Sequence, residues 1–334
     1  MSKPVVCFGE VLLRFAPPGR ELFLQSPEMA VTVAGAEANV AVALASFGTP
    51  SKMLTVLPDN GLGRAALSEI RKHGVDTSAI AFGSGRMGLF FLTPGAVRRP
   101  SEILYDRAGS AFALTPTACR ADHAAAEARW FHVSGVTPAL NRDCANAAIA
   151  AAKAARSNGV PVSFDGNYRS KLWESWKNEA PGILRQLFEQ ADIVFGDERD
   201  IGLVLGKTFE GEGRRTRAAK AAFDTFPNLK RIACTQRTPH SVDAQDYGAV
   251  MYTRTTEHTI GEVELVGIVD RVGTGDAFAA GVVHGLLTNL SDHEALAFGH
   301  AAACLKHSLP GDFFTLGADA VRAALAGDGL DVKR

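Results

Sequence analysis

The stretch Asp270–Phe278 combines residue types that could catalyse the transfer of a phosphoryl group. Gly273 and Gly275 flank a single residue, Asp276 follows at once, and a run of small residues comes next. This order predicts a strand end, a tight glycine turn and the start of a helix. The free N–H groups of such a turn favour an anion, and Asp276 could take a proton from a hydroxyl that attacks a phosphate there. An ordinary glycine turn in which Asp276 caps the helix accounts for these residues equally well.

Charged and aromatic side chains at two other predicted strand ends could bind a sugar that carries an acid group. Asp165–Arg169 follows the apolar run Val160–Phe164, and the planar guanidinium of Arg169 suits a carboxylate or a phosphate. Tyr105 and Arg107 are two residues apart, so they share one face of a strand. One could pack on a sugar while the other binds its acid group. A solvated arginine and a contact between subunits are the plain alternatives.

Further segments could contact hydroxyls, a metal ion or phosphates. Gly35–Asn39 opens a predicted helix, where glycine lets the backbone approach a ligand and free N–H groups can donate to hydroxyls. Asp197 and Asp200 follow a predicted strand and could hold hydrated Mg²⁺ near phosphates. Thr235–Arg237 follows another strand and could touch phosphates. The plain alternatives are a helix start, acidic residues that favour a helix N-terminus, and a solvated loop.

Asp312, His132 and the cysteines have patterns typical of structural residues. Asp312 lies in the Pro-Gly turn that ends the last predicted core helix, where it could cap that helix. His132 alternates with apolar neighbours, and the histidines have no metal-ligand spacing. The cysteines are scattered and form no C-x-x-C pair, so we expect reduced, mostly buried thiols of a cytoplasmic protein at Cys7, Cys119, Cys144, Cys234 and Cys304.

The elements that must position these residues alternate between strands and helices from Trp130 onward. Such alternation predicts a mostly parallel central sheet flanked by helices, with sites beyond the C-terminal ends of the strands. Two segments with short strand-like pieces, about 11–33 and 85–107, predict one small β-sheet that serves as a lid. The expected strands are Val5–Gly9, Met87–Leu92, Ile103–Tyr105, Phe131–Ser134, Val160–Phe164, Ile193–Gly196, Ile232–Thr235, Ala249–Tyr252 and Val263–Val266. The expected helices are Gly35–Gly48, Asp143–Ser157, Pro181–Gln190, Glu198–Leu205, Arg217–Phe226, Thr274–Leu287 and His293–His307.

Composition limits the class of protein. The chain has 334 residues, of which 46% are hydrophobic and 21% charged, as is typical of a globular protein with a large core. A net charge of −1 gives no field that would recruit nucleic acid or an anionic membrane. The N-terminus lacks a charged region followed by a long apolar core, and no apolar run could span a bilayer, so we expect neither secretion nor membrane anchoring. The tail Asp331–Arg334 is expected to fray.

Taken together, these motifs resemble the PfkB (ribokinase-like) family of sugar kinases over nearly the whole chain. The two main markers are Gly35-Ala36-Glu37-Ala38-Asn39-Val40-Ala41 near the start and Asp270-Arg271-Val272-Gly273-Thr274-Gly275-Asp276 near the end. Four further strings are most similar to the 2-keto-3-deoxygluconate kinases within that family: Gly9–Arg14, Ser134–Leu140, Asn167–Trp173 and Lys306–Phe313.

The resemblance implies one ribokinase-like α/β domain over residues 1–334, with a lid that often pairs in a dimer. It implies that ATP and Mg²⁺ are used to phosphorylate the terminal hydroxyl of 2-keto-3-deoxygluconate, giving 2-keto-3-deoxy-6-phosphogluconate. Asp276 would be the general base, and the N–H groups of Gly273, Thr274 and Gly275 would form the anion hole for the γ-phosphate. The resemblance implies sugar contacts from Gly35, Asn39, Phe90, Tyr105, Arg107, Arg169 and Asp312. It implies nucleotide contacts from Asp197, Asp200, Thr235, Arg237, Gly273 and Gly275, with Asp200 as the metal contact.

Some positions depart from the family pattern. Phe90 stands where many relatives have a tyrosine, so one hydroxyl contact would be missing. Asp197 stands where an asparagine is usual, which weakens the expected metal contact. Ala34 replaces the first of a glycine pair, and Thr274 replaces the usual alanine or glycine between the two turn glycines.

Two other functions stay open at this point. A kinase for a neutral ketose such as fructose or tagatose would need no arginine pair, so Arg107 and Arg169 favour a sugar acid. A non-catalytic sugar sensor need not keep a base, so Asp276 favours an enzyme. A dinucleotide-binding oxidoreductase is excluded because Gly9-Glu10-Val11, and not a G-x-G-x-x-G turn, follows the first strand.

Overall fold

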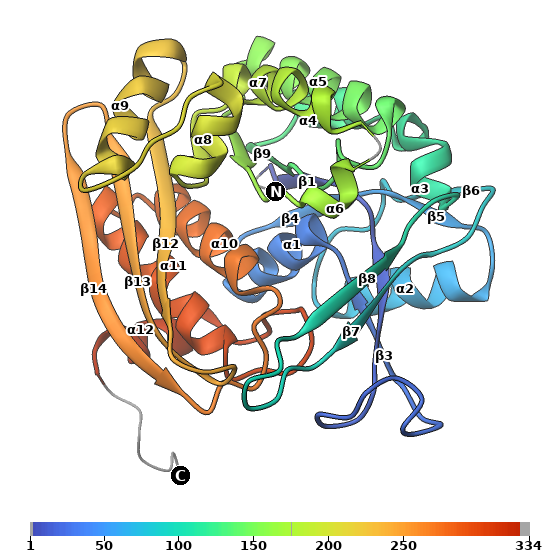
Figure 1. Cartoon of the computed structure of the whole chain (residues 1–334). Coiled ribbons are helices and arrows are strands. Elements are labelled where there is room, and N and C mark those ends of the chain that lie inside the picture. The colour runs from blue at the N-terminus through green and yellow to red at the C-terminus, as the bar shows by residue number, and fades with distance from the viewer. Residues whose placement is uncertain (1–2, 175, 328–334) are drawn as a thin grey trace.

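An eight-stranded sheet forms the centre of the computed structural model, which describes residues 3–174 and 176–327 (Figure 1). The strand order is β14-β13-β12-β11-β10-β9-β1-β4. Neighbouring strands from β12 to β4 are parallel, whereas β13 and β14 are antiparallel to their neighbours, so the predicted mostly parallel sheet is confirmed. The strands are β1 (Val5–Phe8), β4 (Ser51–Leu54), β9 (Trp130–Ser134), β10 (Val162–Asp165), β11 (Ile193–Phe195), β12 (Arg231–Pro239), β13 (Ala244–Thr253) and β14 (Glu257–Val266).

Both faces of this sheet are covered, which explains the continuous apolar runs of its central strands. Successive residues of β1 point to opposite faces, so Val6 and Phe8 enter one apolar core while Val5 and Cys7 enter the other. The first core is covered by α4 (Ala121–Ala126), α5 (Arg142–Ser157), α7 (Ala180–Gln190), α8 (Glu198–Leu205) and α9 (Arg214–Thr225). The second is covered by α1 (Ala36–Ser46), α2 (Gly61–Lys72), α10 (Thr274–Leu287), α11 (Asp292–Lys306) and α12 (Ala318–Leu325) (Figure 1).

Helix α10, which carries the predicted glycine turn at its start, is buried along most of its length. It packs against α1 and α11. A Cβ atom at Gly281 would lie 2.7 Å from Cα of Gly299, so only glycine lets α10 and α11 approach this closely. Because α10 is held on two sides by other helices, its N-terminus is fixed at the C-terminal edge of the parallel strands.

A second, four-stranded sheet with the order β3-β2-β7-β8 projects from the edge of the central body (Figure 1). Its strands come from the two segments predicted to form a lid: β2 (Leu12–Ala16), β3 (Ala30–Ala34), β7 (Gly88–Thr93) and β8 (Glu102–Asp106). One face of this lid carries a small apolar cluster that includes Leu12, Phe90 and Leu92. Val272 of the glycine turn packs against that cluster, so the lid covers the turn.

The structure extends some predicted elements and adds others. The bounds predicted for α8 and α10 are confirmed, but β12, β13 and β14 are longer than predicted. The end of β12 and much of β14 are exposed and polar, so these parts give no apolar signal in the sequence. The tail Asp331–Arg334 lies outside the described residues. Additional elements are α3 (Ala111–Leu114), α6 (Ser170–Trp173), the two-stranded sheet of β5 (Val56–Pro58) with β6 (Ala81–Gly83), and the 3₁₀ turns Pro116–Cys119 and Lys177–Glu179.

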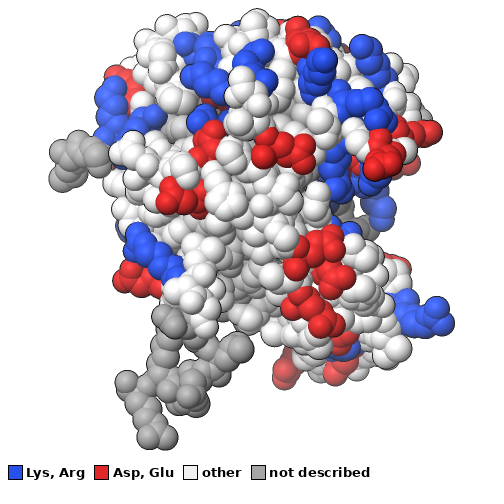
Figure 2. Space-filling view, turned by 90° about the vertical axis from the view of Figure 1, so that its left-hand side faces the viewer, with Lys and Arg blue, Asp and Glu red and all other residues white. Residues whose placement is uncertain are grey.

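The edge strand β14 lies on the side of the molecule that Figure 2 shows. Acidic and basic side chains both occur on this side, with uncharged areas between them. Glu257, Glu262 and Glu264 are exposed along β14, and charges on an edge strand discourage pairing with another sheet. Within the described parts of the chain, every helix is too short or too polar to traverse a bilayer.

Candidate active site

The glycine turn has the predicted form of a strand end followed by a helix start. Gly273 is the N-cap of α10 with a φ of 80°, and an added Cβ would lie 2.1 Å from the carbonyl oxygen of Asp312. Only glycine fits this combination of conformation and space. A Cβ at Gly275 would meet no atom within 4 Å, so the space beside the turn is open. The first N–H groups of α10 have no acceptor within the helix and are available to an anion.

Asp276 lies in the first turn of α10 and is only 9% exposed. Its Oδ2 accepts a hydrogen bond from Nδ2 of Asn39, on α1, at 2.6 Å. The pKa of Asp276 is raised to about 7, mainly by burial and also by the charges of Asp312 and Glu37, while the hydrogen bond from Asn39 opposes the rise. A carboxyl group that ionises near neutral pH can act as a general base.

The start of α1 brings a ligand-approaching glycine next to a buried carboxylate. Gly35 is the N-cap of α1 with a φ of 143°, and a Cβ there would lie 2.4 Å from the carbonyl oxygen of Glu10. Glu37 is buried, and its Oε1 accepts bonds from Ser134 N–H at 2.9 Å, Ser134 Oγ at 2.8 Å and Thr137 Oγ1 at 2.8 Å. These bonds fix α1 to the end of β9. No function was predicted for Glu37, although a lone glutamate in an apolar helix start is a signal of such a buried contact.

The lid places Phe90 and Tyr105 close together, with ring centroids 6.4 Å apart. Arg107 follows β8 and is buried, and its guanidinium forms an ion pair with Glu10. Its Nη1 atom is buried without a hydrogen-bond partner in the described part of the chain. Arg107, which was predicted to bind an acid group, is therefore already paired with the carboxylate of Glu10, and only its Nη1 remains as a buried donor without a partner in the described residues.

Asp312 also has a partner within the protein. It is 3% exposed, and its Oδ1 accepts a bond from Nη1 of Arg14 at 2.8 Å. Arg14, in lid strand β2, also pairs with Asp270 at 2.7 Å. Because these carboxylates flank the glycine turn, Arg14 links the lid to the turn. No function was predicted for Arg14, although it is the last residue of Gly9–Arg14, one of the motifs on which the resemblance rests.

The loop after β10 brings charged groups toward Asp276. Arg169 is exposed at the start of α6, and its positive charge lowers the pKa of Asp276, Asp165 and Asp200. Burial raises the pKa of Asp165 well above its ordinary range, and the negative charges of Asp276 and Asp200 raise it further. The structure thus brings Arg169 together with three carboxylates.

Asp197 and Asp200 form a capping box at the start of α8. Asp197 Oδ1 accepts from the N–H of Arg199 at 2.8 Å, and Asp200 Oδ2 accepts from the N–H of Asp197 at 2.9 Å. The pKa of Asp200 is raised to about 6, mainly by burial and also by the charge of Asp197. A Cβ at Gly166 would lie 3.0 Å from Oδ1 of Asp200, so Asp200 also faces the loop after β10. No group of three or more His, Cys, Asp or Glu residues within the described ranges is arranged to hold a metal ion by itself.

Thr235 and Arg237 lie within the long strand β12 and not in the loop expected for them. Arg237 is exposed, and its charge helps to lower the pKa of Arg271, so it lies near the glycine turn. Thr235 is partly buried beside Tyr247.

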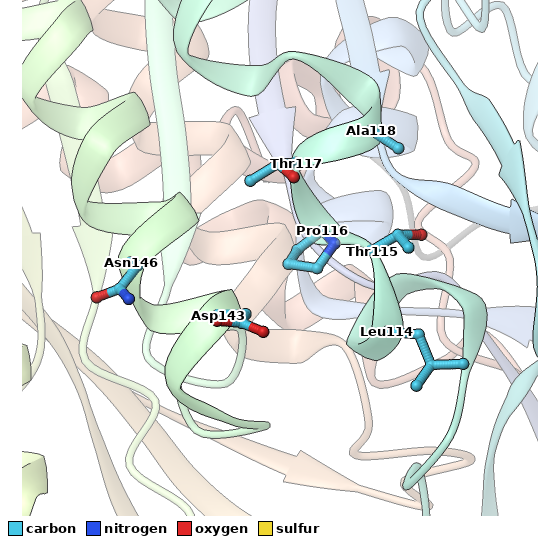
Figure 3. A pocket seen from close by; sticks show the side chains of 7 residues that line it. All are labelled: Leu114, Thr115, Pro116, Thr117, Ala118, Asp143 and Asn146. Carbon is cyan, nitrogen blue, oxygen red and sulfur yellow. The ribbon is translucent and has the colours of Figure 1, made fainter.

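His132 and the cysteines have the structural roles predicted for them. His132 is buried, its Nδ1 lies 2.8 Å from Ser163 Oγ, and burial lowers its pKa to about 3. All five cysteines are free thiols. A hollow at the start of α5 is lined by Asp143, Asn146 and the segment 114–118 (Figure 3). None of the predicted site residues lines it.

Comparisons with known proteins agree with this geometry. Residues 2–314 match the family described as pfkB family carbohydrate kinase. A 2-dehydro-3-deoxygalactonokinase of Haloferax volcanii is 32% identical over 338 residues, covering 100% of both chains. A probable fructokinase-6 of Arabidopsis thaliana is 30% identical, covering 91% of this chain and 77% of its own.

Solved structures show the same fold. A 2-dehydro-3-deoxygluconokinase of Thermotoga maritima has a TM-score of 0.91 and 37% identity, covering 97% of this chain and 100% of its own. A ribokinase-type protein of E. coli in complex with ATP and Mg²⁺ has a TM-score of 0.82 at 19% identity, covering 98% of this chain and 99% of its own, and supports the fold alone. The fold, the glycine turn followed by a buried aspartate, and the match over residues 2–314 show that this chain belongs to the pfkB family of carbohydrate kinases.

Proposed function

We propose that the protein transfers the γ-phosphoryl group of ATP to the terminal hydroxyl of 2-keto-3-deoxygluconate or a closely related 2-keto-3-deoxy sugar acid. The observation that carries this proposal is the position of Asp276. It is buried, bonded to Asn39 at 2.6 Å, and placed in the first turn of α10 beside a glycine turn that opens onto free space. Relatives that are named for 2-keto-3-deoxy sugar acids support the choice of substrate.

Asp276 would act as the general base. A primary alcohol is a weak acid, so the carboxylate accepts the hydroxyl proton while the new O–P bond forms and the bond from the γ-phosphorus to ADP breaks. The N–H groups of Gly273, Thr274 and Gly275 would stabilise the charge on the transferred group. The lid would exclude water and so limit hydrolysis of ATP. Gly35 would let the sugar approach the start of α1.

The carboxylates that face the site fit a hydrated Mg²⁺ ion. Burial raises the pKa of Asp165, and the negative charges of Asp276 and Asp200 raise it further. A divalent cation between carboxylates relieves such repulsion. Asp200 would hold the ion, directly or through water, while Asp197 caps α8. The ion would neutralise phosphate charge. Thr235 and Arg237 would contact the nucleotide.

Two arginines would bind the acid end of the sugar. Arg169 is exposed on the loop that faces Asp276, and Arg107 keeps one buried donor without a partner in the described part of the chain. Tyr105 and Phe90 would pack on the carbon chain of the sugar. Asp312 would support the site through its bond to Arg14.

A neutral ketose such as fructose is the second candidate substrate. The ion pair between Arg107 and Glu10 favours it, because an arginine that is already neutralised attracts an acid less strongly. A coupled assay of ADP release separates the two candidates. We expect the highest kcat/KM with 2-keto-3-deoxygluconate or its galactonate epimer, and much lower values with fructose and ribose. A preference for fructose would refute the acid assignment, and no turnover of any sugar would refute the kinase proposal.

The outer face of the lid supports pairing with a second copy of the chain. Val31, Phe15, Phe91 and Leu104 are neighbours across β3, β2, β7 and β8 and form one apolar row. Val31 and Leu104 are 50% and 62% exposed. An apolar row of this kind on a free sheet face is typical of an interface. We expect a dimer in sedimentation equilibrium, and dissociation on Leu104→Asp; a monomeric wild-type protein would refute the pairing.

A further inference from the structure

Lys306 is a fully buried lysine whose side chain has no role in the proposed phosphoryl transfer. It is the last residue of α11, and its exposed fraction is 0%. An ammonium group so far from water is costly unless hydrogen bonds or opposite charges compensate it. Its Nζ donates to the carbonyl oxygen of Leu309 at 3.1 Å and to that of Gly311 at 2.7 Å. The lysine thus holds the loop after α11 around its own ammonium group.

This loop is the surface on which the glycine turn rests. A Cβ at Gly273 would lie 2.1 Å from the carbonyl oxygen of Asp312 and 3.3 Å from Cε of Lys306. Asp270 joins the turn to the loop, since its Oδ1 accepts the N–H of Val272 at 3.0 Å and its Oδ2 accepts the N–H of Gly311 at 3.2 Å. A shift of Gly311 would therefore move the turn that carries the anion-binding N–H groups.

Three carboxylates near Lys306 favour its charged form, and this ammonium group hydrogen-bonds to the loop. Burial lowers its pKa, while Asp270, Asp312 and Asp276 raise it and Arg14 lowers it. Asp270 and Asp312 pair with Arg14 at 2.7 and 2.8 Å, from the side of the lid. The loop carbonyls, in contrast, receive their hydrogen bonds from Lys306.

We propose that Lys306 is a positioning residue for phosphoryl transfer, a built-in cation that holds the loop 309–312 beneath Gly273 and so keeps the anion-binding turn in place. The inference rests on the proposed function of that turn. Donors that are already in place stabilise a transition state best, because no rearrangement is needed as charge develops. Loss of the cation should therefore lower kcat, whereas KM for the sugar should change little because the proposed sugar contacts come from the lid, the start of α1 and the loop after β10.

The test compares Lys306→Ala and Lys306→Met with the control Lys230→Met. Lys230 has a side chain 64% exposed and directly precedes β12, at the end of the sheet away from the site. Alanine leaves a space that a small cation can enter, whereas methionine fills the space without a charge. Because misplacement by about 1 Å costs about 100-fold, we expect kcat to fall about 10- to 100-fold in both Lys306 variants. Lys230→Met should keep wild-type kcat.

Restoration of kcat by a small cation distinguishes a positioning role of Lys306 from a role in stability alone. Ammonium chloride should restore kcat of Lys306→Ala along a saturation curve and should not restore Lys306→Met. Tetramethylammonium chloride, whose cation is too large for the space, controls for ionic strength. If Lys306→Ala folds only in ammonium chloride, kcat of this variant is measured in ammonium chloride. The inference then predicts an active enzyme, and an inactive folded enzyme would contradict it.

The outcomes separate this inference from the proposed function. Wild-type activity is measured first, and an inactive wild-type protein would refute the proposed function itself. An active wild type with unchanged Lys306 variants would overturn only the inference. A Lys306→Ala variant whose melting temperature rises in ammonium chloride while kcat per folded molecule stays low would also overturn it, because a cation bound in the space would then restore the fold without restoring catalysis.

Discussion

Replacing Asn39 by leucine shifts the pH range in which Asp276 can act as a base. Nδ2 of Asn39 donates to Oδ2 of Asp276 at 2.6 Å, and such a bond stabilises the ionised carboxylate. Oδ1 of Asn39 is buried without a partner in the described part of the chain, so leucine removes no second bond of that side chain. A hydrogen bond to a charged group is worth about 1.5–3 kcal/mol, and one pKa unit corresponds to about 1.4 kcal/mol. Its loss should raise the pKa of Asp276 by about 1–2 units above the wild-type value of about 7.

This increase in the pKa of Asp276 should move the acidic limb of the kcat/KM profile to higher pH, because kcat/KM reports ionisation of the free enzyme. A base must be ionised, so kcat/KM rises with pH through the pKa of Asp276. At pH 7 about half of the wild-type carboxylate is ionised, against about 1–10% in Asn39→Leu. We therefore expect a loss of about 5- to 50-fold at pH 7 that largely disappears by pH 9.5. Initial rates of ADP release from pH 5.5 to 10 measure it.

A matched variant controls for the loss of an asparagine amide. Asn158 is an exposed residue just after α5, at the end of the sheet away from the site, and Asn158→Leu should leave the profile unchanged. If Asn39→Leu lost the same factor at every pH while its acidic limb stayed in place, the carboxylate that titrates would not be Asp276.

Three further results are expected. Asp276→Asn should raise Tm at pH 8 by at least about 2 °C, because burial raises the pKa from 3.8 to about 7 and the ionised carboxylate destabilises the fold as pH rises through that window. The gain should vanish near pH 4 in calorimetry, and a gain that persists there would contradict the assigned pKa. Gly273→Ala should cost about 2 kcal/mol or more in urea unfolding, since its φ is 80° and the new Cβ would lie 2.1 Å from the carbonyl oxygen of Asp312. Gly19→Ala, with a φ of 55° and no atom within 4 Å of the new Cβ, is the control and should cost less. Arg169→Ala should raise KM for an acid substrate about tenfold more than KM for a neutral sugar, because a charge-assisted bond is lost only with the acid. Equal changes in KM would remove the carboxylate contact.

The elements that position the site could be predicted because their signals are local. The start of α10 is marked by Gly273 followed by Gly275 and Asp276, and α8 begins where an acidic pair favours a helix N-terminus. Asp276 was predicted as the base from the same few residues, and the structure places it beside Asn39 from the other main motif.

The charged pairs within the site could not be predicted because they join distant parts of the chain. Arg14 and Asp312 are 298 positions apart, and nothing near either residue in the sequence indicates the other. The ion pair of Arg107 with Glu10 forms only once the lid meets the end of β1. A pattern of residue types identifies a charge but not whether a buried partner neutralises it, which is why the ion pairs of Arg107 and Asp312 within the protein were not predicted.

Turnover of Asp276→Asn at saturating ATP and sugar tests the central claim most directly. Asparagine keeps the shape of the side chain and removes its ability to accept a proton. If the carboxylate is the base, kcat should fall by at least about 100-fold while circular dichroism and Tm show an intact fold. A folded Asp276→Asn protein with kcat near that of the wild type would contradict the assignment.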